Sequence, residues 1–275
     1  MKTRLGLIIM ALTTLIYVSA YAGITDGLVG YWSFDDGTAK DNSGTGNDGV
    51  IIGDPQSVDG KVGKALDFNG DDGIDIASNS TVELADALTA AAWVYPRSVV
   101  DPTNGNDHCG IIWKGNMIGW GTDVYNWRIA TATDQGLTWG SCGGGTEGWF
   151  ATGNAFVDGL ETWYHVALVE DGTEGTAYIN GTALTDADVT GGDRHRPAAP
   201  YDTWPDEPVR IGYSQGRGGD LNNIQYFDGI IDEVVLYNRA LSADEVNELM
   251  ATGIPATAVE PTDKIASVWG KIKED

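Results

Sequence analysis

Two irregular stretches of the chain combine aromatic rings with amide, carboxylate and guanidinium groups. This combination suits sugar recognition, because a ring covers the apolar C–H face of a sugar while planar polar groups bond its hydroxyls. The first stretch lies between Pro96 and Trp163, and the second runs from Asp186 to Pro208. Because tryptophan is usually mostly buried, core packing is the alternative for each ring. The side chains that we predict to bind a ligand are Trp120, Trp127, Trp139, Tyr201, Trp204, Asn126 and Arg128.

Cysteine and histidine are sparse, which argues against a zinc site. The sequence holds three histidines and two cysteines, with neither CxxC nor HxxxH spacing. The cysteines are Cys109 and Cys142, and in an oxidising compartment we expect them to form a disulfide. Two separate thiols are the alternative.

The charge balance narrows the possible partners. Forty acidic residues against sixteen basic ones give a net charge of -24. Such a surface repels phosphate backbones and anionic lipids, so we do not expect nucleic-acid binding. A hydrophobic content of 42% with ten tryptophans is too apolar for a disordered acidic chain, so we expect a packed core.

The first 22 residues have the pattern of a signal peptide. Lys2 and Arg4 precede an apolar run from Leu5 to Val18, and Ala20 and Ala22 form a small-x-small cleavage pattern. The run is shorter than the roughly 20 apolar residues that span a bilayer. We expect cleavage after Ala22, an uncleaved anchor being the alternative. The mature chain then has no membrane span and is secreted or held at the cell surface, or retained in a periplasm.

The body of the chain, residues 23–254, predicts one domain of short β-strands separated by turns. The strongest local signal is the hairpin around Asn180-Gly181, because this pair tolerates the positive φ that a two-residue turn demands. No helix of ordinary length interrupts the strands until the end. Many short strands at close spacing favour an all-β, two-sheet antiparallel jelly-roll sandwich.

One short helix is expected after the last strand. Ser242 and Glu245 have the spacing of a capping box, and Gly253 ends the apolar stripe. Residues 255–275 read as a linker followed by a short amphipathic tail, with Ile265, Val268, Trp269 and Ile272 on one helical face. This tail either docks on the domain, extends from it, or serves as an address for export machinery.

A series of short motifs extends in order over roughly residues 27 to 253. Each is weak alone, but together they resemble the laminin-G-like, concanavalin A-like jelly-roll domains of bacterial secreted proteins. The resemblance implies two antiparallel sheets packed face to face, with Trp32, Trp93 and Trp163 in the core. It does not determine function, because this fold carries lectins, adhesion modules, glycosidases and lyases. The motifs are Gly30–Asp35, Asp41–Gly44, Gly63–Gly70, Leu88–Pro96, Trp163–Ala167, Tyr178–Gly181, Phe227–Val234 and Tyr237–Ser242.

The same resemblance implies one calcium ion, bound partly through the first and last strands. Calcium prefers six to eight hard oxygens from carboxylates and carbonyls. We therefore expect ligands among Asp35, Asn69, Asp71 and Asp232. Solvated turn carboxylates, which are abundant in so acidic a chain, are the alternative.

Catalysis is not expected. Glycoside cleavage usually needs two carboxylates facing one bond. Relatives of this fold that cleave β-glucans carry Glu-x-Asp-x-x-Glu on one strand, which is absent here, and the Arg, Gln-x-His and Tyr motifs of lyase relatives are also missing. The sequence therefore favours a secreted, calcium-stabilised module that binds a glycan or another extracellular ligand. An adhesive surface protein that binds protein partners is the alternative, and a divergent glycoside hydrolase or polysaccharide lyase comes third.

Overall fold

The computed structural model describes most of the segment between the two terminal stretches. Both the proposed signal peptide and the C-terminal tail lie outside the described residues. The described residues are 23–106, 108–116, 124–133, 135–143, 146–193, 200, 203, 205–215 and 224–255.

The first sheet, here called sheet A, holds the two ends of the domain. Its strand order is β13-β12-β11-β6-β18-β4-β3, and β1 pairs with β18 off this path. The pairing of β1 with β18 is antiparallel and aligns Trp32 with Val234, so the opening and closing strands lie side by side. The strands are β1 (Leu28–Trp32), β3 (Gln56–Asp59), β4 (Lys64–Asn69), β6 (Leu88–Pro96), β11 (Tyr164–Glu170), β12 (Gly175–Ile179), β13 (Thr182–Ala183) and β18 (Asp228–Tyr237).

The second sheet, sheet B, carries the middle of the chain in the order β14-β10-β9-β8-β7-β15-β5-β2. Every pairing within it is antiparallel. A separate two-stranded ribbon joins β16 (Tyr213–Ser214) to β17 (Gln225–Tyr226). The strands of sheet B are β2 (Gly49–Ile52), β5 (Gly73–Ile76), β7 (Gly110–Asn116), β8 (Val124–Ala132), β9 (Gly136–Gly143), β10 (Thr146–Thr152), β14 (Val189–Gly192) and β15 (Val209–Ile211).

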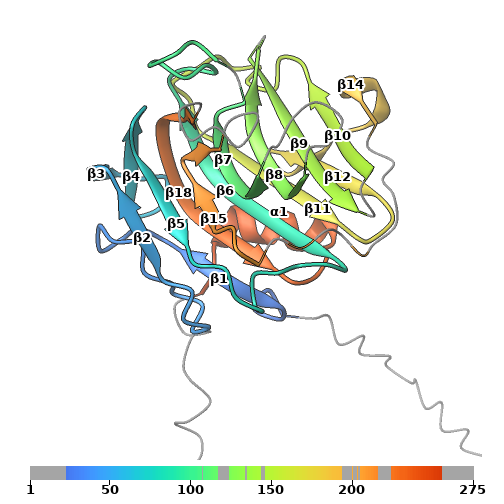
Figure 1. Cartoon of the computed structure of the whole chain (residues 1–275), viewed down its shortest axis with the longest axis horizontal. Coiled ribbons are helices and arrows are strands. Elements are labelled where there is room, and N and C mark those ends of the chain that lie inside the picture. Colours follow the sequence, from blue (N-terminus) through green and yellow to red (C-terminus); the bar gives the residue numbers. More distant parts are fainter. Residues whose placement is uncertain are drawn as a thin grey trace, which may run out of the picture.

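The two sheets form the layers of a sandwich (Figure 1). Alternate residues of each strand point into the space between the sheets, as the period of two requires. From sheet A, Val94 and Val166 enter this core, and from sheet B, Ile129 and Phe150 do so. The prediction of an all-β antiparallel jelly roll is confirmed.

Two local predictions are also confirmed. Asn180 and Gly181 have φ values of 49° and 75°, so both adopt the left-handed conformation of a tight hairpin turn between β12 and β13. Ser242 caps helix α1 (Ala243–Thr252): its hydroxyl accepts from Glu245 N, and Glu245 Oε2 accepts from Ser242 N at 2.8 Å. Beside these α-helical residues the described part contains one 3-10 turn, η1 (Asp186–Asp188).

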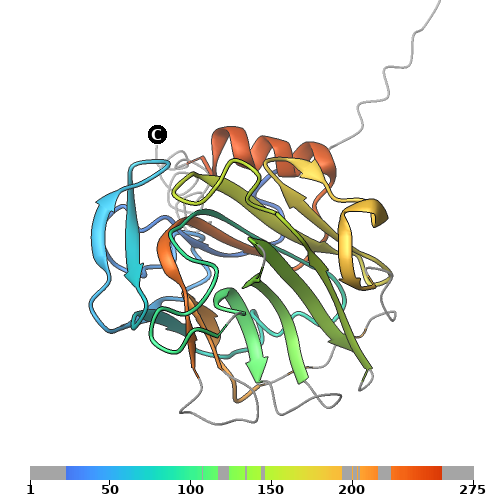
Figure 2. The same cartoon turned by 90° about the horizontal axis from the view of Figure 1, so that it is seen from above.

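Helix α1 covers part of the outer face of sheet A (Figure 2). Val246 and Leu249 pack there against Ala91, Ala167 and Val235 in a second apolar cluster. The strands β7 to β10 lie on the opposite side of the sandwich. Each sheet therefore has one face in the core and one outer face, and α1 shields only one of the two outer faces.

The expected disulfide is incompatible with the strand register. Cys109 lies beside Thr131, whose amide donates to its carbonyl at 3.0 Å, whereas β9 places Ser141, next to Cys142, opposite Trp127. The two cysteines are thus about five residues apart along the strands, roughly 17 Å, and two strands apart across the sheet. A disulfide needs Cα atoms closer than about 7 Å. No disulfide is present among the described residues, and Cys109 is buried.

Candidate functional site

An acidic site forms where the ends of the domain meet. Asp35 follows β1, and Asp232 lies in β18 opposite Trp93. The turn between β3 and β4 passes between them: Asp232 Oδ2 accepts from Val62 N at 3.0 Å, and Asp35 Oδ1 accepts from Lys64 N at 2.9 Å. The close passage requires glycine, because a Cβ at Gly63 would overlap Asp35 Oδ1.

A bulge in β18 brings a third carboxylate to the site. The register of β18 against β6 shifts between Asp232 and Val235, and Glu233 has a φ of 52°. The shift turns Glu233 toward the outer face, where the Tyr31 hydroxyl donates to its two carboxylate oxygens at 3.0 and 2.9 Å. A bulge commonly re-aims a side chain in this way.

Hydrogen bonds offset only part of the negative charge at this site. Asp232 is fully buried, and its Oδ1 has no hydrogen-bond partner. Burial raises the pKa of Asp232 to about 6, and the nearby charge of Asp35 acts in the same direction. Burial also raises the pKa of Glu233 to about 7, with the charges of Asp232 and Asp35 adding to it. Burial, followed by the charge of Glu233, raises the pKa of Tyr31, which keeps its hydroxyl a donor.

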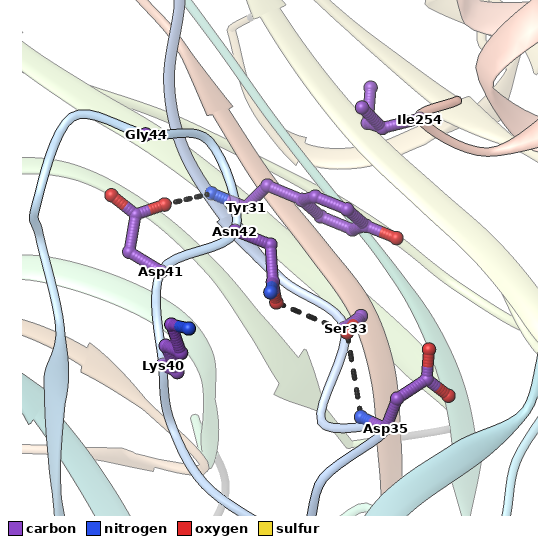
Figure 3. A pocket seen from close by; sticks show the side chains of 8 residues that line it. All are labelled: Tyr31, Ser33, Asp35, Lys40, Asp41, Asn42, Gly44 and Ile254. Atoms are coloured by element: carbon purple, nitrogen blue, oxygen red, sulfur yellow. Dashed lines mark hydrogen bonds between the residues drawn. The ribbon is translucent and has the colours of Figure 1, made fainter. Parts of the chain in front are cut away.

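A pocket of about 390 Å³ opens beside this site (Figure 3). Tyr31 and Asp35 line it together with the loop after β1, in which Asp41 Oδ1 accepts from Tyr31 N at 3.1 Å. On the same wall the Ser33 hydroxyl donates to Asn42 Oδ1 at 3.2 Å. Lys40 and Ile254 also line the pocket, which therefore combines backbone-anchored carboxylates with one cation, one aromatic ring and one aliphatic side chain.

The four expected calcium ligands do not form one group. Asn69 pairs with Asp228, four residues before Asp232 along β18, which is about 13 Å. Asp71 lies in the turn that follows Asn69, at the same far end of β4. Only Asp35 and Asp232 come together, and Glu233 joins them. Among the described residues no cluster of three His, Cys, Asp or Glu side chains has the geometry to hold a metal by itself.

Two of the expected ligand-binding rings lie in the core. Trp127 and Trp139 are both fully buried and belong to the core between the sheets. The register explains this placement, because Ile129 pairs with Trp139 and faces the core, and Trp127 and Leu137 lie two residues away on the same face. Trp139 stacks on Phe150 with ring centres 6.3 Å apart. Neither ring is accessible to a ligand, so this part of the prediction is wrong.

Arg128 takes the opposite face of the same strand. It pairs with Trp113 on one side and with Gly140 on the other, and Gly140 pairs with Trp149. The outer face of sheet B therefore carries the row Trp113–Arg128–Gly140–Trp149. The Arg128 guanidinium lies 5.3 Å from the Trp113 ring centre, and both side chains are buried. Trp149 is 37% exposed.

The remaining expected ligand residues are only partly placed. Asn126 lies in β8 next to an irregularity in the register of β7 against β8, and its side chain is outside the described set. Trp120, Tyr201 and Trp204 lie outside the described residues. Sequence reasoning missed Trp149 and Glu233. Only the alternation of residues along β10 could have indicated that Trp149 takes the outer face. No sequence signal predicts the bulge that turns Glu233 outward.

Trp93 and Trp163 do not lie in the core that the resemblance implied for them. Trp32 does, at 1% exposure. Trp93 and Trp163 lie on the outer face of sheet A, next to Tyr95 and His165, and belong to neither apolar cluster. Trp163 is half-buried.

Comparison with known protein families identifies the superfamily of the chain. The sequence profile of the concanavalin A-like lectin/glucanases superfamily matches residues 68–247. The chain belongs to this superfamily. Comparison of this concanavalin A-like chain with curated proteins gives no match.

Solved structures share the fold of this concanavalin A-like domain. Domain 4 of AbnA, a GH43 extracellular arabinanase from Geobacillus stearothermophilus, in complex with arabinotriose, has a TM-score of 0.59 at 22% identity, over 81% of this chain and 98% of that one. The binding domain of Paraclostridial Mosquitocidal Protein 1 gives 0.60 at 20% identity, over 82% of this chain. The binding domain of Botulinum neurotoxin DC, in complex with rat synaptotagmin II, gives 0.60 at 15% identity, over 84%. The chain spans about half of both toxin domains, 52% of each.

One serine of the concanavalin A-like domain has the sequence context of a nucleophile. Ser214 is the serine of a Gly-x-Ser-x-Gly run, residues 212–216. It is fully buried, and its hydroxyl donates to His108 O at 2.8 Å. A nucleophilic serine of this motif stands exposed on a sharp turn, so Ser214 does not have that arrangement.

Among the described residues, no helix has the length and apolar character needed to cross a membrane.

Proposed function

We propose that this concanavalin A-like domain is an exported, calcium-stabilised module that binds glycans without cleaving them. Three features support the proposal: the N-terminal pattern of a signal peptide, the partly compensated acidic site at the chain ends, and the aromatic and cationic row on the outer face of sheet B. The similar arabinanase domain, which is described in complex with arabinotriose, supports the ligand class.

The calcium part of the proposal is carried by the unpartnered oxygen of Asp232. A fully buried carboxylate oxygen without a donor is costly, and two further carboxylates of the same charge lie nearby. A divalent cation removes both costs. Asp35, Asp232 and Glu233 would supply carboxylate oxygens, the hard donors that calcium prefers. The bound ion would fix the turn between the first and last strands, which is a structural role.

Calcium is expected to raise the melting temperature of the full-length protein. At a free concentration about 100 times the Kd, binding to the folded state alone adds about 2.7 kcal/mol, or about 5–10 °C for a domain of this size. Melting is measured with calcium and with excess chelator. Asp232→Asn should abolish the shift, and Asp71→Asn, at the far end of β4, should leave it intact. Equal melting temperatures with calcium and with chelator would contradict the calcium site.

The glycan part of the proposal rests on Trp149. Its indole is exposed on the outer face of sheet B, between Gly140 in the neighbouring strand and Gly191 in β14. A Cβ at position 191 would lie 3.3 Å from the indole, so glycine there allows the ring to lie close to β14. A rigid exposed ring is suited to the C–H face of a sugar. Arg128 and Trp113 belong to the same row but are buried, so the exposed indole would make the contact.

Absence of catalysis is part of the proposal. Paired carboxylates of glycoside hydrolases stand about 5–10 Å apart across an open cleft. The carboxylates that come together here are held by Tyr31 and by backbone amides, and we assign them to the cation. Incubation of the protein with the polysaccharides that it binds should release no reducing ends.

A glycan array in calcium buffer tests the binding proposal. The wild-type protein should bind at least one glycan, and Trp149→Ala should weaken that binding about tenfold, as the loss of one stacking ring would. Val157→Ala is the matched control, because Val157 is an exposed apolar residue outside this row. Full binding by Trp149→Ala would show that sheet B does not hold the sugar.

A protein ligand is the second candidate. The similar neurotoxin domain is described in complex with synaptotagmin II, and edge strand β2 of this chain exposes Val50 and Ile52, which are 68% and 37% accessible. An exposed apolar edge strand suits the addition of a strand from a partner protein. A glycan array without hits would favour this candidate if the wild-type protein also binds a protein ligand that Val50→Lys does not bind.

A further inference from the structure

The outer face of sheet A carries four rings in a compact group. Residues 94, 164 and 166 point into the core, so their neighbours in β6 and β11 point outward. The register places His165 opposite Trp93, with ring centres 5.3 Å apart, and the Tyr95 and Trp163 ring centres are 5.6 Å apart. The four rings therefore form two adjacent pairs on neighbouring strands.

One of these pairs is accessible and the other supports it. Trp93 and His165 are 9% and 2% exposed, and the Lys61 ammonium lies 4.4 Å from the Trp93 ring centre. Tyr95 and Trp163 are only half-buried. Helix α1 packs on a different part of this face, over Ala91 and Ala167. Two strands thus hold a tilted ring pair at the surface, and little conformational entropy remains to be lost when a ligand binds.

A set of polar groups borders the rings. Arg97 follows Tyr95 by two residues, and its guanidinium donates to Asp228 at 2.8 Å, to Asp67 at 2.7 Å and to Phe68 O at 2.8 Å. The ion-paired side chains remain 21% to 29% exposed. Asp67 and Asp228 each accept the hydrogen bond from Arg97 through Oδ1. Asp67 lies in the row of Tyr95, one strand beyond Ile230.

The geometry points to a second glycan-binding surface, formed by Tyr95 and Trp163 and bordered by Arg97, Asp67 and Asp228. This inference takes its ligand class from the proposed function. The ion pairs fix planar polar groups beside the rings, which is what hydroxyl recognition requires. Arg97 offsets only one of the two carboxylates, and the remaining negative charge favours a neutral sugar over an acidic one. From Trp163 to Asp67 the row crosses four strands, about 14 Å, which suits a short oligosaccharide segment.

The two surfaces lie on opposite outer faces of the sandwich. Trp149 belongs to sheet B, and Tyr95 and Trp163 belong to or adjoin strands of sheet A, with the whole core between them. One ligand segment therefore cannot occupy both. A domain with both surfaces would hold two glycan chains at once and cross-link them, with the gain in avidity that two linked sites give.

Native affinity electrophoresis of the full-length protein tests this inference. The gels contain soluble neutral polysaccharides, namely arabinan, xylan, mannan and mixed-linkage β-glucan. At least one should retard the wild-type protein, and Trp163→Ala should weaken that interaction about tenfold, whereas Trp163→Phe, which keeps a ring, should weaken it less than about threefold. Tyr95→Ala provides an independent variant, and melting temperatures check that each variant is folded.

The outcomes separate this surface from the one on sheet B. If both surfaces bind polysaccharide, Trp149→Ala and Trp163→Ala should each retain part of the retardation, and the double variant should lose it. Only the wild-type protein, which can cross-link chains, should then make the polysaccharide solution turbid. Loss in Trp149→Ala with unchanged retardation in folded Trp163→Ala and Tyr95→Ala would overturn the second surface and leave the proposed function standing. No retardation of the wild type by any of the four polysaccharides would overturn both for neutral glycans.

Discussion

Replacing Trp139 by alanine is expected to lower the free energy of unfolding by about 3–5 kcal/mol, the usual cost of removing a buried tryptophan. The side chain is fully buried, stacks on Phe150 and faces the core between the sheets. Its removal loses apolar burial and leaves a cavity that strands on both sides prevent from closing. Urea unfolding followed by circular dichroism measures the change.

Trp149 provides the matched control for this experiment. It lies in the neighbouring strand of the same sheet, on the other face, and is 37% exposed. Trp149→Ala should therefore change the free energy of unfolding by less than about 1 kcal/mol, while it weakens glycan binding. Equal destabilisation by the two substitutions would contradict the assignment of one ring to the core and the other to the surface.

The contrast between these two rings shows where sequence reasoning stops. The aromatic enrichment of residues 97–162 is visible in the sequence, but the face that each ring takes depends on strand parity. In Gly136–Gly143 the alternation of apolar and polar residues extends only over Leu137, Thr138 and Trp139, because Gly140 and Ser141 follow and do not continue it. The polar neighbours of Trp127 and Trp139 favour the surface, and the strand register places both rings in the core instead.

The fold itself could be predicted because its signals are local. Asn180-Gly181 defines a turn by backbone conformation alone, and Ser242 with Glu245 defines a helix start by two hydrogen bonds. The pairing of the first and last strands is a long-range feature. It followed from the resemblance of the motifs around Trp32 and Val234, not from the residues themselves.

The acidic site could be predicted only in part for the same reason. Asp35 and Asp232 come together because β1 pairs with β18, which the resemblance implied. The approach of Glu233 requires the bulge, and the exclusion of Asn69 requires the register of β4 against β18. Both are properties of strand pairing that a count of carboxylates does not contain.

A buried histidine on the outer face of sheet A should make the domain sensitive to acid. Burial lowers the pKa of His165 from 6.5 to about 4. Between these values the unfolded chain takes up a proton that the folded protein does not, so stability is lost as the pH falls below about 6.5. The titration of this single group should lower the free energy of unfolding by about 2 kcal/mol between pH 8 and pH 5.

The variant His165→Phe isolates this contribution. Phenylalanine cannot titrate, retains a ring against Trp93, and loses no hydrogen bond at Nδ1, because that atom has no partner in the structure. The measured quantity is the free energy of unfolding of the variant minus that of the wild-type protein, in excess calcium. This difference should be about 2 kcal/mol larger at pH 5 than at pH 8. Other carboxylates titrate over the same interval in both proteins, so they cancel in the difference. A stability difference independent of pH would mean that folded His165 accepts a proton near its ordinary pKa, which requires water to reach a ring that packs against Trp93 and is only 2% exposed.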